Sequence, residues 1–270
     1  MLKIKLLVII VSSLFFKFMG KIISVVNQKG GVGKTTTSVN LGAYLAHFGK
    51  KTLLVDVDPQ ANATSGLGIN HRQVERGVYD VLTGNCSILD SIIKTKQENY
   101  YIIPATVSLS GASVELVGLD NREFRLSSAL EEIRNNFDYI IIDGPPSLGL
   151  LTVNSLTSSD EVLIPIQSEY YALEGLGQLL ETISLIQNNL KPSLGIMGVI
   201  ITMFDKRNRL SSLVKDELYK YFPNKVFKSI IPRSVRLAEA PSYGLSILQY
   251  DPKSIGARAY EELAKEIISK

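Results

Sequence analysis

Cysteine is almost absent from this chain of 270 residues, because Cys86 is the only one. A single cysteine cannot form a disulfide within the chain, and it cannot build a zinc or iron–sulfur site from several cysteine ligands of one chain. Electron-transferring iron proteins and iron–sulfur carriers are therefore excluded, because both need cysteines that this chain lacks. A reducing compartment is compatible with this composition, and we expect a cytoplasmic protein.

The sequence also lacks internal repeats, low-complexity tracts and obvious linkers. Hydrophobic residues make up 45% of the chain, which is enough to bury a large core. We therefore interpret residues 19–270 as one domain.

The first 18 residues, MLKIKLLVIIVSSLFFKF, form a separate hydrophobic extension. Basic residues followed by an apolar run from Leu6 to Phe16 resemble the start of a secretory signal, but no small-residue cleavage site follows. The run is too short to span a bilayer comfortably. We expect a misassigned start, with Met19 as the true first residue; a membrane-tethering segment is the alternative.

The net charge of +3 is small, but its distribution is uneven. Basic residues clearly outnumber acidic ones in the C-terminal third, whereas the rest of the chain has a slight acidic excess. This bias permits a face that binds a polyanion. A solvated helical surface would explain the charges equally well.

Short apolar runs alternate with helical patterns along the chain. The patterns predict helices at 34–48, 122–135, 173–188, 211–221 and 255–268, and strands at 22–26, 52–57, 101–103, 139–142, 161–166 and 198–203. Such alternation predicts an α/β fold, with a doubly wound, mostly parallel sheet and helices on both faces. Ligands of such sheets bind at the carboxyl ends of the strands.

A glycine-rich phosphate-binding motif, KGGVGKTT, joins the first predicted strand to the first predicted helix. Glycines let backbone N–H groups approach a phosphate, and the helix N-terminus adds partial positive charge. Lys34 is suited to bridge the outer phosphates of ATP, and Thr35 to ligate Mg²⁺. The predicted nucleotide-binding residues are Lys29, Gly30, Gly31, Val32, Gly33, Lys34, Thr35 and Thr36. The motif makes the expected fold P-loop NTPase-like, and a plain glycine turn is the alternative.

A second lysine, Lys29, opens the same loop. An ordinary phosphate-binding loop needs only Lys34, so a lysine before the three glycines marks a deviant form of the motif. Taken alone, Lys29 could instead be a solvated surface lysine.

Three aspartates stand at the ends of two predicted strands. Asp56 and Asp58 close the strand at 52–57, and Asp58 is the better candidate to orient the attacking water. Asp143 ends the strand at 139–142, where it is placed to hold Mg²⁺. The predicted metal site thus consists of Thr35, Asp58 and Asp143. A turn-forming role is the alternative for each aspartate.

Several long motifs resemble one protein family from about Met19 to the C-terminus. They are KGGVGKTT, LLVDVDPQANATSGLG, YIIIDGPPSLGLLTVNSL, IPIQSEYYALEGLGQLL and IPRSVRLAEAPSYG. Together they are similar to the ParA/Soj chromosome- and plasmid-partitioning ATPases.

The resemblance implies roles for single residues. Lys29 would be the lysine that reaches across a dimer to the partner's nucleotide, and Gly30 would lie where two subunits meet. The implied catalytic residues are Lys29, Lys34 and Asp58. Pro232 and Ser234 belong to a segment that would lie beside the adenine base, although family members often have Asn where Ser234 stands.

The resemblance also implies partners. An ATP-dependent homodimer would bind non-specific DNA on the nucleoid through Arg207 and Arg236, with contacts to phosphates that weaken as salt rises. A ParB/Spo0J-like centromere-binding protein would stimulate hydrolysis and release the dimer. A local ion pair is the alternative for each arginine.

Two other functions stay open. A MinD-like cell-division ATPase would grip a membrane through a basic amphipathic helix at its C-terminus. Here the tail has apolar Leu263, Ile267 and Ile268, but its three glutamates, Glu261, Glu262 and Glu266, disfavour an anionic membrane. A nucleotide-binding scaffold without turnover is the second alternative, and Asp58 and Asp143 argue against it. Nothing in the sequence distinguishes a chromosome from a plasmid as cargo.

Overall fold

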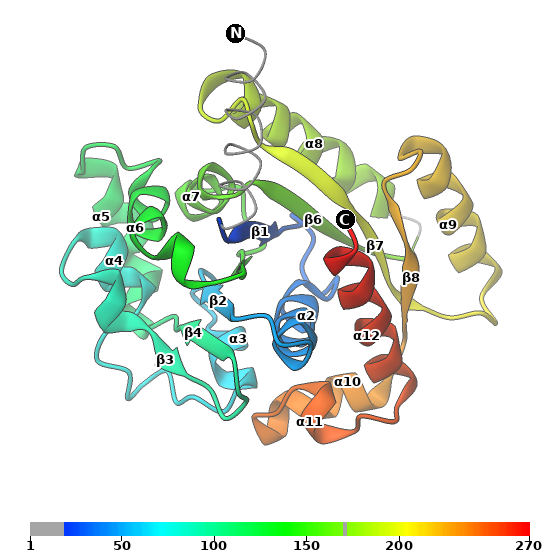
Figure 1. Ribbon diagram of the computed structural model, residues 1–270. Helices are drawn as coiled ribbons and strands as arrows, with labels where there is room; N and C mark the ends of the chain where they lie inside the picture. Colours follow the sequence, from blue (N-terminus) through cyan, green and yellow to red (C-terminus); the bar gives the residue numbers. More distant parts are fainter. Residues whose placement is uncertain (1–18, 170–171) are drawn as a thin grey trace, which may run out of the picture.

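An eight-stranded sheet forms the centre of the molecule (Figure 1). A computed structural model describes residues 19–169 and 172–270, and every structural statement refers to these residues. The strand order is β3-β4-β2-β5-β1-β6-β7-β8, and only β3 runs antiparallel to its neighbour. The strands are β1 (Lys21–Val25), β2 (Thr52–Asp56), β3 (Ile93–Lys94), β4 (Tyr100–Ile103), β5 (Tyr139–Asp143), β6 (Glu161–Gln167), β7 (Gly195–Phe204) and β8 (Val226–Pro232).

Helices cover both faces of this sheet (Figure 1). One face carries α2 (Lys34–His47), α3 (Asn62–Gly66), α10 (Val235–Glu239), α11 (Ile247–Tyr250) and α12 (Ile255–Ile268). The other face carries α4 (Val78–Thr83), α5 (Ala112–Glu115), α6 (Arg125–Ile133), α7 (Leu150–Ser158), α8 (Ala172–Asn189) and α9 (Arg209–Tyr221). The predicted doubly wound, mostly parallel α/β fold is therefore confirmed.

The strand sequences explain why the sheet is covered on both sides. Successive side chains of a strand point to opposite faces, so a strand buried on both faces reads as a continuous apolar run. In β5, Ile141 joins the hydrophobic cluster beneath α2, whereas Ile140 and Ile142 join the cluster beneath α4 and α6. The run YIII is apolar throughout because it serves both cores.

Most predicted elements match the observed ones within a few residues, and the last helix, at 255–268, matches fully. The observed helix α6 is shorter than the predicted helix at 122–135, because residues 122–124 precede it in a turn and residues 134–136 form a separate 3-10 helix. Two substantial elements, β8 and α7, were not predicted from the sequence. The short helices α3, α4, α5, α10 and α11 and the two-residue strand β3 were not predicted either.

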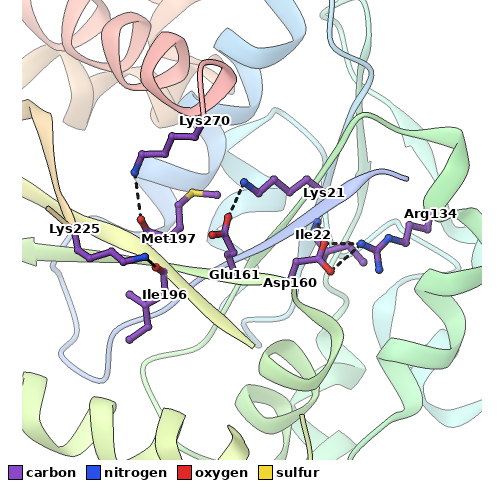
Figure 2. A network of polar contacts seen from close by, with 9 residues as sticks. All are labelled: Lys21, Ile22, Arg134, Asp160, Glu161, Ile196, Met197, Lys225 and Lys270. Carbon is purple, nitrogen blue, oxygen red and sulfur yellow. Dashed lines mark hydrogen bonds and ion pairs between the residues drawn. The ribbon is translucent and has the colours of Figure 1, made fainter. Parts of the chain in front are cut away.

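A network of polar contacts joins the amino ends of the strands (Figure 2). The Arg134 side chain donates to the Gly20 carbonyl at 2.9 Å and to the Asp160 carboxylate at 2.7 Å, and this carboxylate also accepts from the Ile22 backbone N–H at 2.8 Å. Further contacts at these strand ends join Lys21 to Glu161, Lys225 to Ile196 and Lys270 to Met197. Residues 20–22 are thus integral to the fold.

The hydrophobic extension at 1–18 lies outside the described residues, so the predicted start at Met19 stays a prediction.

Candidate active site

The glycine-rich loop connects the carboxyl end of β1 to the first turn of α2, as the sequence predicts. Gly31 and Gly33 have φ angles of +74° and +88°, in the left-handed region that favours glycine. No atom lies within 4 Å of where a Cβ would stand on Gly30 or Gly31. The loop therefore presents backbone and the N-terminus of α2 to open space, which is the arrangement that binds phosphate.

Lys34 is the first residue of α2, directly after this loop, and it is only 6% exposed. Its Nζ donates to the Lys29 carbonyl at 3.2 Å. Burial lowers the pKa of the Lys34 ammonium, whereas the nearby carboxylates of Asp143 and Asp58 oppose that shift. The predicted phosphate-binding lysine and both predicted acids therefore share one electrostatic environment.

Lys29 lies at the rim of the site, with its side chain about one-third exposed. Its Nζ is 3.5 Å from a carboxylate oxygen of Glu169, which follows β6. Glu169 is also 3.7 Å from Arg233, a residue of the predicted adenine-binding segment. The backbone N–H of Lys29 donates to the buried side chain of Asn27 at 2.9 Å, which fixes the start of the loop. Lys29 thus has a partner within its own subunit.

Thr35 and Asp143 meet where the loop faces the end of β5. The Thr35 hydroxyl donates to one Asp143 oxygen at 2.8 Å, and the Ser38 hydroxyl donates to the other at 2.8 Å. Asp143 is fully buried, and burial together with the neighbouring Asp56 raises its pKa well above the usual range of a carboxyl. A buried carboxylate and a hydroxyl are the hard oxygen donors that Mg²⁺ prefers.

These two residues fit a metal that also binds phosphate oxygens. Within residues 19–169 and 172–270, no cluster of three or more His, Cys, Asp or Glu could hold a metal ion alone. Mg²⁺ usually takes one or two protein ligands and completes its shell with phosphates and water. The pair of Thr35 and Asp143 matches that pattern, and Asp58 lies close enough to act on Lys34.

Asp56 and Asp58 differ in their surroundings, although both stand at the end of β2. Asp56 is fully buried, and its carboxylate accepts from the backbone N–H and the hydroxyl of Thr64 at 2.8 and 2.6 Å. Asp58 is 6% exposed and accepts from the Gln60 backbone N–H at 2.9 Å. Asp56 is therefore engaged inside the protein, which leaves Asp58 as the candidate for water.

A pocket of about 340 Å³ lies beside the loop, on the side away from the acids. Pro232 and Ser234 line it together with Gly33 and Thr36 of the phosphate-binding motif. The Thr202 hydroxyl, from β7, donates to the Val32 carbonyl at 2.8 Å and so ties the loop to this wall. The predicted adenine-binding residues and the phosphate-binding loop are therefore neighbours, although about 200 residues separate them in the sequence.

The two arginines predicted to bind DNA both form local ion pairs. Arg207, with a side chain 90% exposed, lies 2.8 Å from Asp205. Arg236 lies 2.9 Å from Glu239 and 3.5 Å from Asp251. Ion pairs between exposed side chains contribute little to stability, so both guanidinium groups can exchange partners at low cost. The role of these arginines in DNA binding stays a prediction.

The C-terminal helix α12 uses its apolar side within the protein. Leu263 and Ile267 are buried, and Ile268 packs against the same core cluster as α2. Glu266 accepts from the backbone N–H groups of Lys228 and Ser229 in β8, at 3.0 and 2.7 Å. In the described part of the chain, no helix combines the length and the apolar character that a membrane crossing requires.

Several residues that shape this site were not predicted from the sequence. Ser38 could have been found, because it lies one helical turn after Thr35 and shares its face. Asn27, Thr202 and Glu169 carry no such local signal, since each acts on a segment that is distant in sequence. Thr64 carries none either, because it joins Asp56, eight positions earlier, to Ala105, 41 positions later.

Comparisons with known proteins agree with this geometry. Residues 20–196 match a family of AAA domains. The chain is 59% identical to the sporulation initiation inhibitor protein Soj of Bacillus subtilis, and the match covers 92% of this chain and 98% of that protein. It is 52% identical to the chromosome-partitioning ATPase Soj of Treponema pallidum, over 93% of this chain and 98% of that protein.

Solved structures with the same architecture contain nucleotide. The cobyrinic acid a,c-diamide synthase of Mycobacterium smegmatis with ADP and magnesium has a TM-score of 0.82 and 36% identity, and covers 93% of this chain and 94% of that chain. The septum site-determining protein MinD of Pyrococcus horikoshii with Mg-ADP has a TM-score of 0.76 and 29% identity, and covers 92% and 96%.

Proposed function

This chain belongs to the Soj/ParA family of chromosome-partitioning ATPases, and on that basis we propose that ATP converts it into a dimer that binds DNA without sequence preference. The chain is an ATPase, and its nucleotide and metal are ATP and Mg²⁺. Its role in partitioning follows from the family. Dimerisation, DNA binding and partner-stimulated hydrolysis are the steps that we propose.

One observation carries the catalytic part of this proposal: Lys34 is buried within the electrostatic reach of both Asp58 and Asp143. Lys34 would hold the outer phosphates, and Thr35 with Asp143 would hold the metal. Bound Mg²⁺ supplies charge neutralisation of the phosphates. Asp58 would orient the attacking water. The residue needed for hydrolysis is thus distinct from the residues that bind ATP and Mg²⁺.

Dimerisation would depend on Lys29 and Gly30 at the rim of the loop. The space around Gly30 is open, and the Lys29 side chain is partly exposed. We propose that Lys29 leaves Glu169 when ATP is bound and reaches the nucleotide of a second copy. The exposed Lys29–Glu169 pair would cost little to break.

DNA binding would follow dimerisation and would use phosphate contacts. Arg207 and Arg236 are exposed and lie in the basic C-terminal third. Two copies in one dimer would double the number of cationic contacts, and affinity for a polyanion rises steeply with that number. We propose that a ParB/Spo0J-like partner stimulates hydrolysis, which separates the dimer and releases it from the nucleoid.

A MinD-like membrane role is the second candidate. The likeness to MinD favours it, but MinD is less similar than the Soj proteins. A membrane-binding C-terminal helix would need an apolar face available to lipid, whereas α12 buries Leu263 and Ile267 inside the protein. The tail therefore disfavours the membrane role.

The experiment that tests the switch measures molecular mass by light scattering with ATP, ADP or no nucleotide. We expect Asp58→Ala to accumulate as a dimer with ATP, because it binds ATP but cannot orient water. Lys34→Ala should stay monomeric, because it loses the phosphate-binding charge. Rapid ATP turnover by Asp58→Ala would refute the role of Asp58, and a monomer under all conditions would refute the switch.

A further inference from the structure

Asp56 is a fully buried acid that has no place in the proposed chemistry. It stands opposite Asp143 in the register of β2 and β5, one strand away from the phosphate-binding loop. Its Oδ1 accepts from the Asp58 backbone N–H at 3.2 Å, and its Oδ2 accepts both the N–H and the hydroxyl of Thr64. A buried carboxylate with these three donors ties together the two ends of the segment 58–64.

This segment contains an unusual turn. The Ala61 N–H donates to the Asp58 carbonyl at 2.9 Å, and Ala61 has a φ of +52°, which a residue with a side chain rarely adopts. Such a conformation persists only where the surroundings determine it. The two ends held by Asp56 supply that constraint, and Asp58 lies at one of them.

Thr64 extends the constraint to a second strand. Its hydroxyl donates to Asp56 at 2.6 Å and accepts from the Ala105 backbone N–H at 3.0 Å, just after β4. One hydroxyl therefore joins α3 to the carboxyl ends of β2 and β4. Thr64 is buried, so solvent offers no substitute for either bond.

The other site residues are held by different contacts. Lys34 donates to the Lys29 carbonyl, and Asp143 accepts from Thr35 and Ser38. Loosening the segment 58–64 would therefore displace Asp58 and leave Lys34, Thr35 and Asp143 in position.

We propose that Asp56 and Thr64 are positioning residues for hydrolysis, which act by fixing the backbone of the segment that carries Asp58. This inference rests on the proposed role of Asp58. It assigns to the Asp56–Thr64 pair a specific effect on turnover, separate from nucleotide affinity, because a reacting group displaced by about 1 Å can lose about a hundredfold in rate.

The test compares Thr64→Val with Thr64→Ser in the full chain. Valine has the shape of threonine without the hydroxyl, whereas serine keeps it. We expect Thr64→Val to lower kcat for ATP at least about tenfold and to leave the Kd for ATP within about twofold, while Thr64→Ser stays near wild type. Thr83→Val is the matched control, because the Thr83 hydroxyl bonds only within α4. Active sites are counted by ATP titration.

Asp56→Asn is the second variant, in case Thr64→Val does not fold. The amide would present an N–H donor to one of the N–H or O–H donors that the carboxylate accepts, so we expect a similar loss of kcat. Because the charge of Asp56 also raises the pKa of Asp143, the Kd for ATP of this variant is measured without Mg²⁺. Equal losses of kcat and ATP affinity, or wild-type kcat in both variants, would overturn the inference.

Asp58→Ala separates this failure from that of the proposed function. If Asp58→Ala turns over ATP at the wild-type rate, the role of Asp58 is wrong. If Asp58→Ala loses ATP turnover, while Thr64→Val and Asp56→Asn both turn over ATP at the wild-type rate, only the positioning inference is wrong.

Discussion

At the scale of single residues, the candidate site contains buried charged groups of opposite sign, and each lowers the cost of burying the other. Lys34 and Asp143 are both buried, and burial disfavours the charged form of each. Their mutual attraction and the hydroxyl groups of Thr35 and Ser38 offset part of that cost. A nucleotide with its metal brings further charge of both signs to the same place. Residues at the rim, in contrast, form exposed pairs that can exchange.

The pair of Lys29 and Glu169 gives the first prediction. Glu169→Gln keeps the shape of the side chain and removes the charge that holds Lys29 within its own subunit. Because an exposed ion pair contributes roughly 0.2–1 kcal/mol and two such pairs would break in each dimer, we expect the protein concentration for half-maximal ATP-driven dimerisation to fall about two- to thirtyfold. Analytical ultracentrifugation measures this. Glu181→Gln, an exposed glutamate on α8, is the control, and identical behaviour of the two variants would contradict the prediction.

Arg236 gives the second prediction. Arg236→Glu would place a third acid beside Glu239 and Asp251 and would repel DNA phosphates. We expect it to lose DNA binding at least about tenfold while it keeps ATP-driven dimerisation. Fluorescence anisotropy with a labelled duplex measures this. Lys94→Glu makes the same charge change on the distant edge strand β3. An unchanged affinity in Arg236→Glu, or an equal loss in both variants, would contradict the role of Arg236.

The residues of the phosphate-binding loop could be predicted because their roles follow from one contiguous segment. The relation between Thr64 and Asp56 could not, because Thr64 has no distinguishing neighbour in the sequence and acts through a fold that brings α3 beneath β2. The Ser38 hydroxyl, in contrast, could have been inferred once Thr35 was placed beside Asp143, because Ser38 shares the helix face of Thr35 although it is 105 positions from Asp143.

At the scale of elements, α2 is the support of the site, because it begins in the phosphate-binding loop and runs beneath the sheet. Gly42 in this helix faces the fully buried ring of Tyr100, and a Cβ on Gly42 would overlap the ring atoms. The Tyr100 hydroxyl donates to the Val39 carbonyl of the same helix at 3.0 Å. The close approach of helix and strand therefore requires glycine at this position.

Gly42→Ala tests this packing. Overpacking costs about 1–3 kcal/mol, which exceeds the roughly 1 kcal/mol that alanine gains over glycine in a helix. We expect a net loss in the free energy of unfolding, measured by urea denaturation. Gly177→Ala in α8 is the matched control, because no atom lies within 4 Å of its Cβ position, and it should stabilise by about 0.5–1 kcal/mol. A more stable Gly42→Ala protein would contradict the packing argument.

The two missed elements show why local patterns are insufficient at this scale. The helix α7, LLTVNSLTS, is rich in serine and threonine, which have low helix propensity. It forms because Asn154 and Thr157 bond to the carbonyls of Arg122 and Glu123, well before the helix in sequence. The strand β8 is an edge strand that includes the exposed Lys228, so it lacks the continuous apolar run of the inner strands.

At the scale of the whole molecule, the carboxyl and amino ends of the strands have different roles. The carboxyl ends of β1, β2 and β5 are neighbours in the strand order, and they bring the loop, Asp58 and Asp143 together. The amino ends are joined by the Arg134–Asp160 network (Figure 2). The sequence predicted a site at the carboxyl ends from the rule for parallel sheets. The wall formed by Pro232 and Ser234 depended on the family resemblance, because the strand order that places β7 and β8 beside the loop cannot be read from local patterns.

The most direct test of the central claim is DNA binding by the protein that starts at Met19, measured with ATP, ADP or no nucleotide over a salt series. We expect binding that requires ATP, does not depend on sequence, and falls linearly with salt on a double-logarithmic plot. Binding that is equal in all three nucleotide states, or no binding to DNA in any of them, would contradict the claim that ATP switches this protein onto DNA.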